Sequence, residues 1–174
     1  TAVVPQTFAR PARGEGQRQG PRRQRERGDG AGREHFEQQH KENVEFREGL
    51  REIPADERLE AIKAHREMQH RENLVFFAEQ HEKRVARIRE CDKLDDEQKA
   101  ELISFAQVQY AKRVAFHTRL HEDAIAFLEE TLGNDDLTRE QKHEALKAHH
   151  QRAKANVRAF REEMRQAWKE KIEE

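Results

Sequence analysis

The chain has 174 residues, of which 40% are charged and 34% hydrophobic, and its net charge at pH 7 is −1. That length suits one domain of ordinary size. No apolar run is long enough to span a membrane, and a single cysteine, Cys91, excludes an intrachain disulfide.

Residues 1–33 are predicted to form a disordered basic arm. Six of the eight Gly and three of the four Pro precede Glu34, and the first 34 residues carry a net charge of +4, against −5 for the rest. Such a composition buries too little apolar surface to offset the entropy lost on ordering. The arm is either a solubilising linker or a contact for an anionic surface, nucleic acid or partner protein. Its Arg residues lack interleaved aromatic residues, so no specific nucleic acid is expected.

The remainder, residues 34–174, is predicted to be one helical domain, because it has almost no Gly or Pro and no alternating strand pattern. Breaks near Pro54, Asp95 and Gly133 divide it into a short helix at 34–52 and three long helices at 55–91, 95–131 and 138–172. Pro54 suits the first turn of a helix. Thr138 with Gln141 forms a capping box, and 95–98 forms a weaker one. We therefore expect an all-α antiparallel bundle of three long helices and one short N-terminal helix.

An internal repeat of about 41–43 residues accompanies these breaks. The segments 53–57, 94–98 and 137–141 occupy equivalent places, and the sequence from Ala61 to His65 matches that from Ala145 to His149. We interpret this as duplication of a helical unit whose apolar face needs neighbours to cover it.

The segment Leu137-Thr138-Arg139-Glu140-Gln141 is an LTxxQ motif, and 94–98 is a degenerate copy. Paired LTxxQ motifs in a charged, all-helical small protein resemble the Spy/CpxP-type periplasmic chaperones and the zinc-resistance-associated proteins. This resemblance implies a periplasmic, usually oligomeric α-hairpin protein of the envelope-stress or metal response, with unfolded proteins as clients. The chain differs from that pattern in its three long helices and its basic arm. Because it begins with Thr1 rather than Met, we also expect that a signal peptide was removed or the chain trimmed, which fits a periplasmic or otherwise secreted protein.

The histidines are predicted to gather at one height of the bundle. Folding the helices back at their breaks places His70 beside His117 and His65 opposite His121, with His149 near the latter. Four of these interrupt apolar stripes of helical period rather than polar faces. Neutral imidazole binds Zn and Cu well, so the sequence predicts a Zn or Cu site. Its candidate ligands are His65, His70, His117, His121 and His149, with Glu67 as a carboxylate. The alternative is a set of boundary histidines hydrogen-bonded to nearby Glu.

These observations favour an extracytoplasmic metal-binding or stress-chaperone-like protein that acts by binding rather than catalysis, as a homo-oligomer or in a larger complex. No enzyme is expected, because there is no Gly-rich phosphate loop, Ser104 is the one serine, and Cys91 has no partner His nearby. One alternative is a structural or assembly subunit that docks through the basic arm. Another is a di-metal oxidase, which requires inward Glu on at least three helices. The segment 74–78 is apolar on every face of a helix, so Val75 and Phe76 face either a second chain, a client or the chain's own helices.

Overall fold

The chain forms four α-helices and, within residues 30–173, no strand. The computed structural model describes these residues. Its helices are α1 (Ala31–Gly49), α2 (Arg58–Arg89), α3 (Asp96–Leu132) and α4 (Arg139–Glu173). The prediction of an all-helical chain with one short and three long helices is confirmed, with every bound within three residues. The arm predicted at 1–33 lies outside the described residues apart from its last four, and α1 already includes 31–33. None of the described helices is apolar enough over its length to cross a membrane.

Two capping boxes start the last two helices, as the sequence predicts. The carboxylate of Asp95 accepts the Gln98 backbone N–H at 2.8 Å, and the Gln98 side chain accepts the Asp95 N–H at 3.1 Å. The same reciprocal pair joins Thr138 and Gln141 at 3.2 and 2.8 Å. Each pair satisfies two backbone donors that a helix N-terminus leaves unpaired.

Removing the first of these caps tests its contribution to stability. We expect the Asp95→Ala variant to lose about 1 kcal/mol of unfolding free energy, the usual cost of an N-cap lost to alanine. Urea unfolding followed by circular dichroism measures the loss. Asp92→Ala in the same loop is the control, because its side chain makes no hydrogen bond to a described residue. Equal losses in the two variants would show that the capping box does not stabilise α3.

The start of α2 differs from the prediction. Pro54 does not occupy its first turn, since the helix begins at Arg58. The backbone N–H of Glu57 donates to the Pro54 carbonyl at 3.1 Å, which closes a turn ahead of the helix. The guanidinium of Arg58 donates to the carbonyls of Ile53 and Arg51 at 2.9 and 3.3 Å. These bonds hold residues 54–57 in a turn, so α2 begins later than the sequence predicts.

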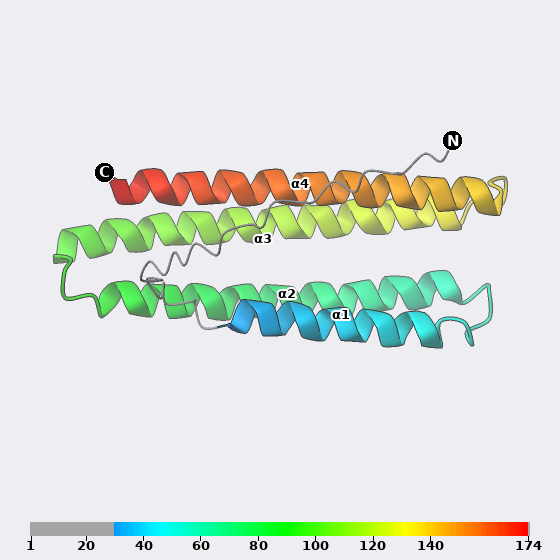
Figure 1. Cartoon of the computed structure of the whole chain (residues 1–174), viewed down its shortest axis with the longest axis horizontal. Helices are drawn as coiled ribbons and strands as arrows, with labels where there is room; N and C mark the ends of the chain where they lie inside the picture. Colours follow the sequence, from blue (N-terminus) through cyan, green and yellow to red (C-terminus); the bar gives the residue numbers. More distant parts are fainter. Residues whose placement is uncertain (1–29, 174) are drawn as a thin grey trace, which may run out of the picture.

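The three long helices lie side by side, and α1 runs along only one half of α2 (Figure 1). Near one end of the α2–α3 pair, Lys63 Nζ lies 2.6 Å from a carboxylate oxygen of Glu129. Further along, the ring of His81 stacks on Tyr110 with centroids 4.5 Å apart. Residue numbers that rise along α2 therefore meet falling numbers on α3. The part of α2 that follows Phe77 has no α1 beside it.

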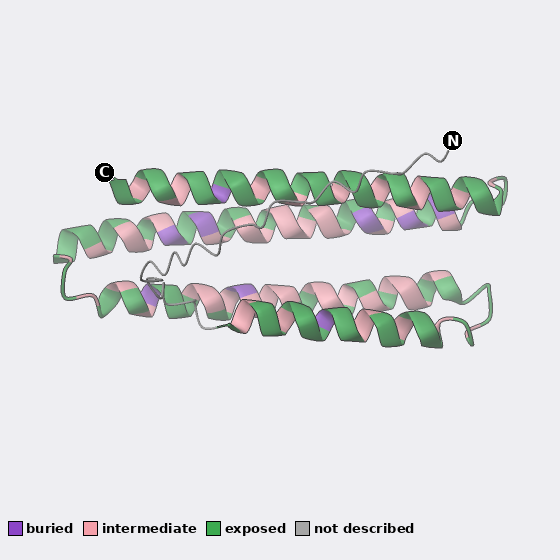
Figure 2. Cartoon of the chain, viewed as in Figure 1, coloured by how far each residue is buried: buried purple, intermediate pink, exposed green. Residues whose placement is uncertain are grey.

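The core of the described residues is thin, as the scattered purple segments of Figure 2 show. No side chain there is less than 2% exposed, and the buried apolar residues come mostly from α2 and α3. They are Phe77, Val85, Ala106, Ala124, Leu128 and Met164. Because so few residues are buried, aromatic and histidine side chains at the edges of the core account for much of the contact between helices.

Candidate metal site

Four of the five predicted histidine ligands line one cavity. His70 from α2, His117 and His121 from α3, and His149 from α4 surround a space of about 250 Å³. The adjacent His150 lines it as well, although the sequence analysis placed only one of the two neighbours in the ligand set. His150 could have been added to the candidate ligands from the sequence, because it directly follows His149 at the boundary of the same helix face. Three helices therefore bring five imidazoles to one place, as the common height predicts.

The centre of this group is a stacked pair of imidazoles. The rings of His70 and His121 lie 4.3 Å apart between centroids and 1° from parallel. Nε2 of His121 is 2.8 Å from a carboxylate oxygen of Glu67, whose second oxygen accepts a hydrogen bond from Arg71 at 3.1 Å. These two hydrogen bonds lower the pKa of the Glu67 carboxyl, so it is ionised at neutral pH. The bond to Glu67 orients the His121 ring.

The pairing across α2 and α3 differs by about one helical turn from the prediction. His121 meets His70 and Glu67 rather than His65, and His117 packs against Phe77, with centroids 4.6 Å apart, rather than against His70. Side chains that share a helix face recur only every three or four residues. A small error in the position of the turn near Lys93 therefore moves the contacts by a whole turn.

His65 lies apart from the cavity. Its ring stacks on Phe46 of α1 with centroids 4.0 Å apart, and its Nε2 is 3.2 Å from the Asn43 side-chain oxygen. The residue points at α1 rather than at α3. The sequence predicts how far along the bundle His65 lies, and this placed it among the candidate ligands. It does not predict the direction around α2 in which the side chain faces.

Three histidines of the cavity wall, His70, His117 and His149, have lowered pKa values, which favour the neutral form of their rings. Burial lowers the pKa of His117 to about 4, with further lowering by Arg113, Arg161 and His70. Burial is also the main cause of the lowered pKa values of His70 and His149. A neutral imidazole offers a lone pair to a metal ion, whereas an imidazolium does not.

The side chains do not stand as a finished metal site. Within residues 30–173, no three His, Cys, Asp or Glu side chains converge closely enough to hold one ion. His149 stacks on Phe127 with centroids 4.1 Å apart, and His117 packs on Phe77, so both rings are turned toward aromatic neighbours. Binding of an ion by three imidazoles therefore requires rotation of one of these rings and of one ring of the stacked pair, because the in-plane lone pairs of His70 and His121 cannot meet at one ion.

The carboxylates needed for a di-metal centre are not at this place. Glu67 alone among the described acidic residues is bonded to a histidine, and the cavity wall has no Asp or Glu. A di-metal bundle draws inward carboxylates from most of its helices. The described residues therefore do not match the pattern of a di-metal centre.

Other predicted features of this region have mixed outcomes. His143 of α4 is exposed. Phe76 packs against His35 and Phe36 of α1, whereas Val75 is 60% exposed. The chain's own α1 therefore covers Phe76, and only Val75 faces outward.

Comparisons of the chain with models of protein families, with curated proteins and with solved structures gave no match.

Proposed function

We propose that this protein binds a single Zn or Cu ion through the histidine cavity and acts by binding rather than catalysis. The observation that carries the proposal is that five histidines from three helices line one cavity. His70 and His121 are the first two ligands, because their side chains are already adjacent. One of the two rings must turn out of the stack, since the in-plane nitrogen lone pairs of parallel rings cannot meet at one ion. The third is His117 or His149, after rotation of its ring off an aromatic neighbour.

Glu67 has a different role in this proposal from the one its spacing suggests. A metal-bound histidine commonly donates its other ring nitrogen to a carboxylate, which sets the tautomer and the ring orientation. The contact between Glu67 and Nε2 of His121 matches that pattern and leaves Nδ1 of His121 for the ion. We therefore assign Glu67 to orienting His121 rather than to the ligand set.

Calorimetric titration of the full chain with Zn²⁺, Cu²⁺ and Ni²⁺ tests the proposal. We expect at least one ion to bind more tightly than about 100 μM, which corresponds to about −5.5 kcal/mol. His121→Ala should weaken that affinity by about tenfold or more, and Glu67→Gln by about tenfold, the usual range for an orienting carboxylate.

Two histidines serve as matched controls. His143→Ala removes an exposed imidazole of α4, and His65→Ala removes one that faces α1. Both variants should bind the ion as the unchanged chain does. Loss of affinity in the His65 variant, with His121→Ala unaffected, would refute the cavity as the binding place.

The broader role is part of the same proposal. An extracytoplasmic location and a chaperone-like activity rest on the LTxxQ resemblance and stay predictions. An antiparallel bundle built from 41–43-residue repeats also stays a prediction. Two observations support it: residue numbers rise along α2 where they fall along the facing α3, and α3 and α4 begin with equivalent capping boxes.

A further inference from the structure

A second, larger cavity lies in the half of the molecule that α1 does not cover. It is a groove of about 770 Å³ whose wall combines residues of α2, α3 and α4 with the first turn of α1. We call it the aromatic–arginine groove. Its wall includes Phe77, Phe160 and Trp168, and no Asp or Glu of residues 30–173 lines it. It also has six arginines, which are Arg33, Arg84, Arg87, Arg113, Arg161 and Arg165.

Three of these arginines lack an acidic partner among the described residues. Arg33 pairs with Glu37 and Arg165 with Glu162, but no described carboxylate is bonded to Arg84, Arg113 or Arg161. The guanidinium of Arg84 instead lies over the Trp168 ring, 4.5 Å from its centroid, and that of Arg113 lies 5.6 Å from the centroid of Phe77. Burial and the neighbouring arginines lower the pKa of both groups. The groove therefore concentrates positive charge that the described residues leave uncompensated.

Two neutral donors on the groove wall also lack an acceptor among residues 30–173. The indole N–H of Trp168 and the side-chain amide nitrogen of Gln80 are buried, and no described residue accepts a hydrogen bond from either. A buried donor without an acceptor costs free energy until one is supplied. An anionic acceptor with apolar surface around it would therefore complement the described residues of the groove wall.

The shape of the groove favours a helix as its occupant. The stretch of α4 from Val157 to Trp168 that lines it rises about 17 Å, at 1.5 Å per residue. In the other half of the molecule, α1 lies against α2 (Figure 1). Beyond Phe77 no described helix takes that place. A helix of about three turns would complete a four-helix arrangement there.

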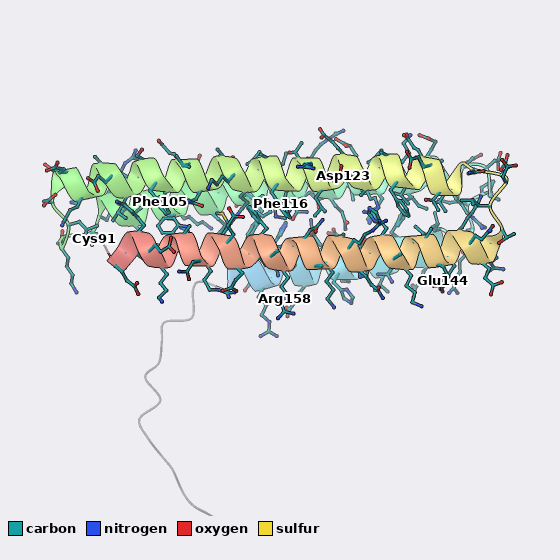
Figure 3. All side chains as sticks on the ribbon, turned by 90° about the horizontal axis from the view of Figure 1, so that it is seen from above. Cys91, Phe105, Phe116, Asp123, Glu144 and Arg158 are labelled. Atoms are coloured by element: carbon teal, nitrogen blue, oxygen red, sulfur yellow. The ribbon has the colours of Figure 1, made fainter. Side chains whose placement is uncertain are left out.

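Phe160 and Trp168 on the groove wall are already packed against other side chains, which argues against stacked bases. Phe160 stacks on Phe116 with centroids 4.0 Å apart, Trp168 meets Phe105 edge to face, and Arg84 covers a face of the indole. Phe105 and Phe116, labelled in Figure 3, lie on the side of α3 toward α4. Binding of single-stranded nucleic acid depends on open ring faces. The apolar side chains of a bound helix can pack against the edges of these rings, so they do not need open ring faces.

We propose that the aromatic–arginine groove binds an acidic amphipathic helix of a partner protein. Apolar residues at i, i+3, i+4 and i+7 of that helix contact the phenylalanines and Met164, and its Glu or Asp residues pair with Arg84, Arg113 and Arg161. The chain's own N-terminal segment is a poor occupant, because residues 1–29 contain seven Arg against three acidic residues. The proposal does not depend on metal in the histidine cavity.

The single tryptophan of the chain provides a direct readout, because Trp168 lies on the groove wall. The probes are two synthetic 14-residue helical peptides with the same leucine stripe, one with Glu and the other with Lys at the remaining positions. We expect the Glu peptide to bind the full chain at least tenfold more tightly than the Lys peptide, by anisotropy of a peptide label. Binding should also change Trp168 fluorescence and weaken as salt is added.

Charge reversal locates the binding place. Arg161→Glu and Arg84→Glu, one on α4 and one on α2, should each weaken the Glu peptide about tenfold. Arg89→Glu, also on α2 but not on the groove wall, is the matched control and should leave its affinity unchanged. Circular dichroism of each variant verifies that the helices are retained.

Several results would overturn the proposal. These are equal binding of the two peptides, binding without a change in Trp168 fluorescence, and equal loss in the Arg89 control. Tighter binding of a 12-nucleotide single strand would assign the groove to nucleic acid. Tighter binding of a synthetic peptide of residues 1–29 would assign it to the chain's own segment. Failure of metal to bind in the calorimetric titration would leave these outcomes unaffected.

Discussion

Replacing Phe77 by alanine is expected to lower the free energy of unfolding by about 3–4 kcal/mol. Phe77 is 4% exposed and contacts Phe76 and His117, and the guanidinium of Arg113 lies over its ring. Truncation of a buried phenylalanine removes its transfer free energy and leaves a cavity between helices, which costs about 3–5 kcal/mol in well-packed cores. We expect the lower part of that range, because the ring borders two existing cavities into which neighbours can relax.

Val75 provides the matched control, two residues away on the same helix. It is 60% exposed, so Val75→Ala should change stability by no more than about 0.5 kcal/mol. Urea unfolding of both variants, followed by circular dichroism, gives the two differences. A cost for Phe77→Ala no larger than that of the control would show that α2 and α3 are not held together at this point.

The second large effect is a loss of stability on acidification. Burial lowers the pKa of His117 from 6.5 to about 4 in the folded chain, so the unfolded chain binds a proton more readily. The contribution of the neutral ring is therefore complete above pH 6.5, falls as pH drops below 6.5, and continues to fall until about pH 4. From this single residue we expect a loss of about 2 kcal/mol between pH 7 and pH 5. His65, His70 and His149, with pKa values also lowered, add to it in the same direction.

Chemical unfolding at several pH values in the presence of a chelator measures this effect without metal. In the His117→Leu variant the free energy of unfolding should change less between pH 7 and pH 5 than in the unchanged chain. His143→Ala removes an exposed histidine and should keep the original pH profile. If His117→Leu shows the same profile as the unchanged chain, the His117 ring is not buried in the folded protein.

Local sequence features were enough to predict the four helices and most of their ends. The capping boxes that begin at Asp95 and Thr138 form as predicted, because their bonds join residues only three positions apart. Pro54 is the exception. Its place in a turn depends on bonds from Arg58 back to Arg51 and Ile53, which span more residues than a capping motif.

The helical class, the positions of the breaks and the height of the histidines could be predicted from the sequence, because they follow from propensity, capping and distance along a helix. That His121 pairs with His70 and Glu67, and that His65 turns to α1, depends on how the helices pack in the folded chain. The rotation of each helix about its axis depends on packing against all its neighbours at once, and one turn of slippage changes every partner. The aromatic–arginine groove also depends on the packing of the helices. It is open because α1 begins only beside Phe76, and the arginines of the groove come from all four helices.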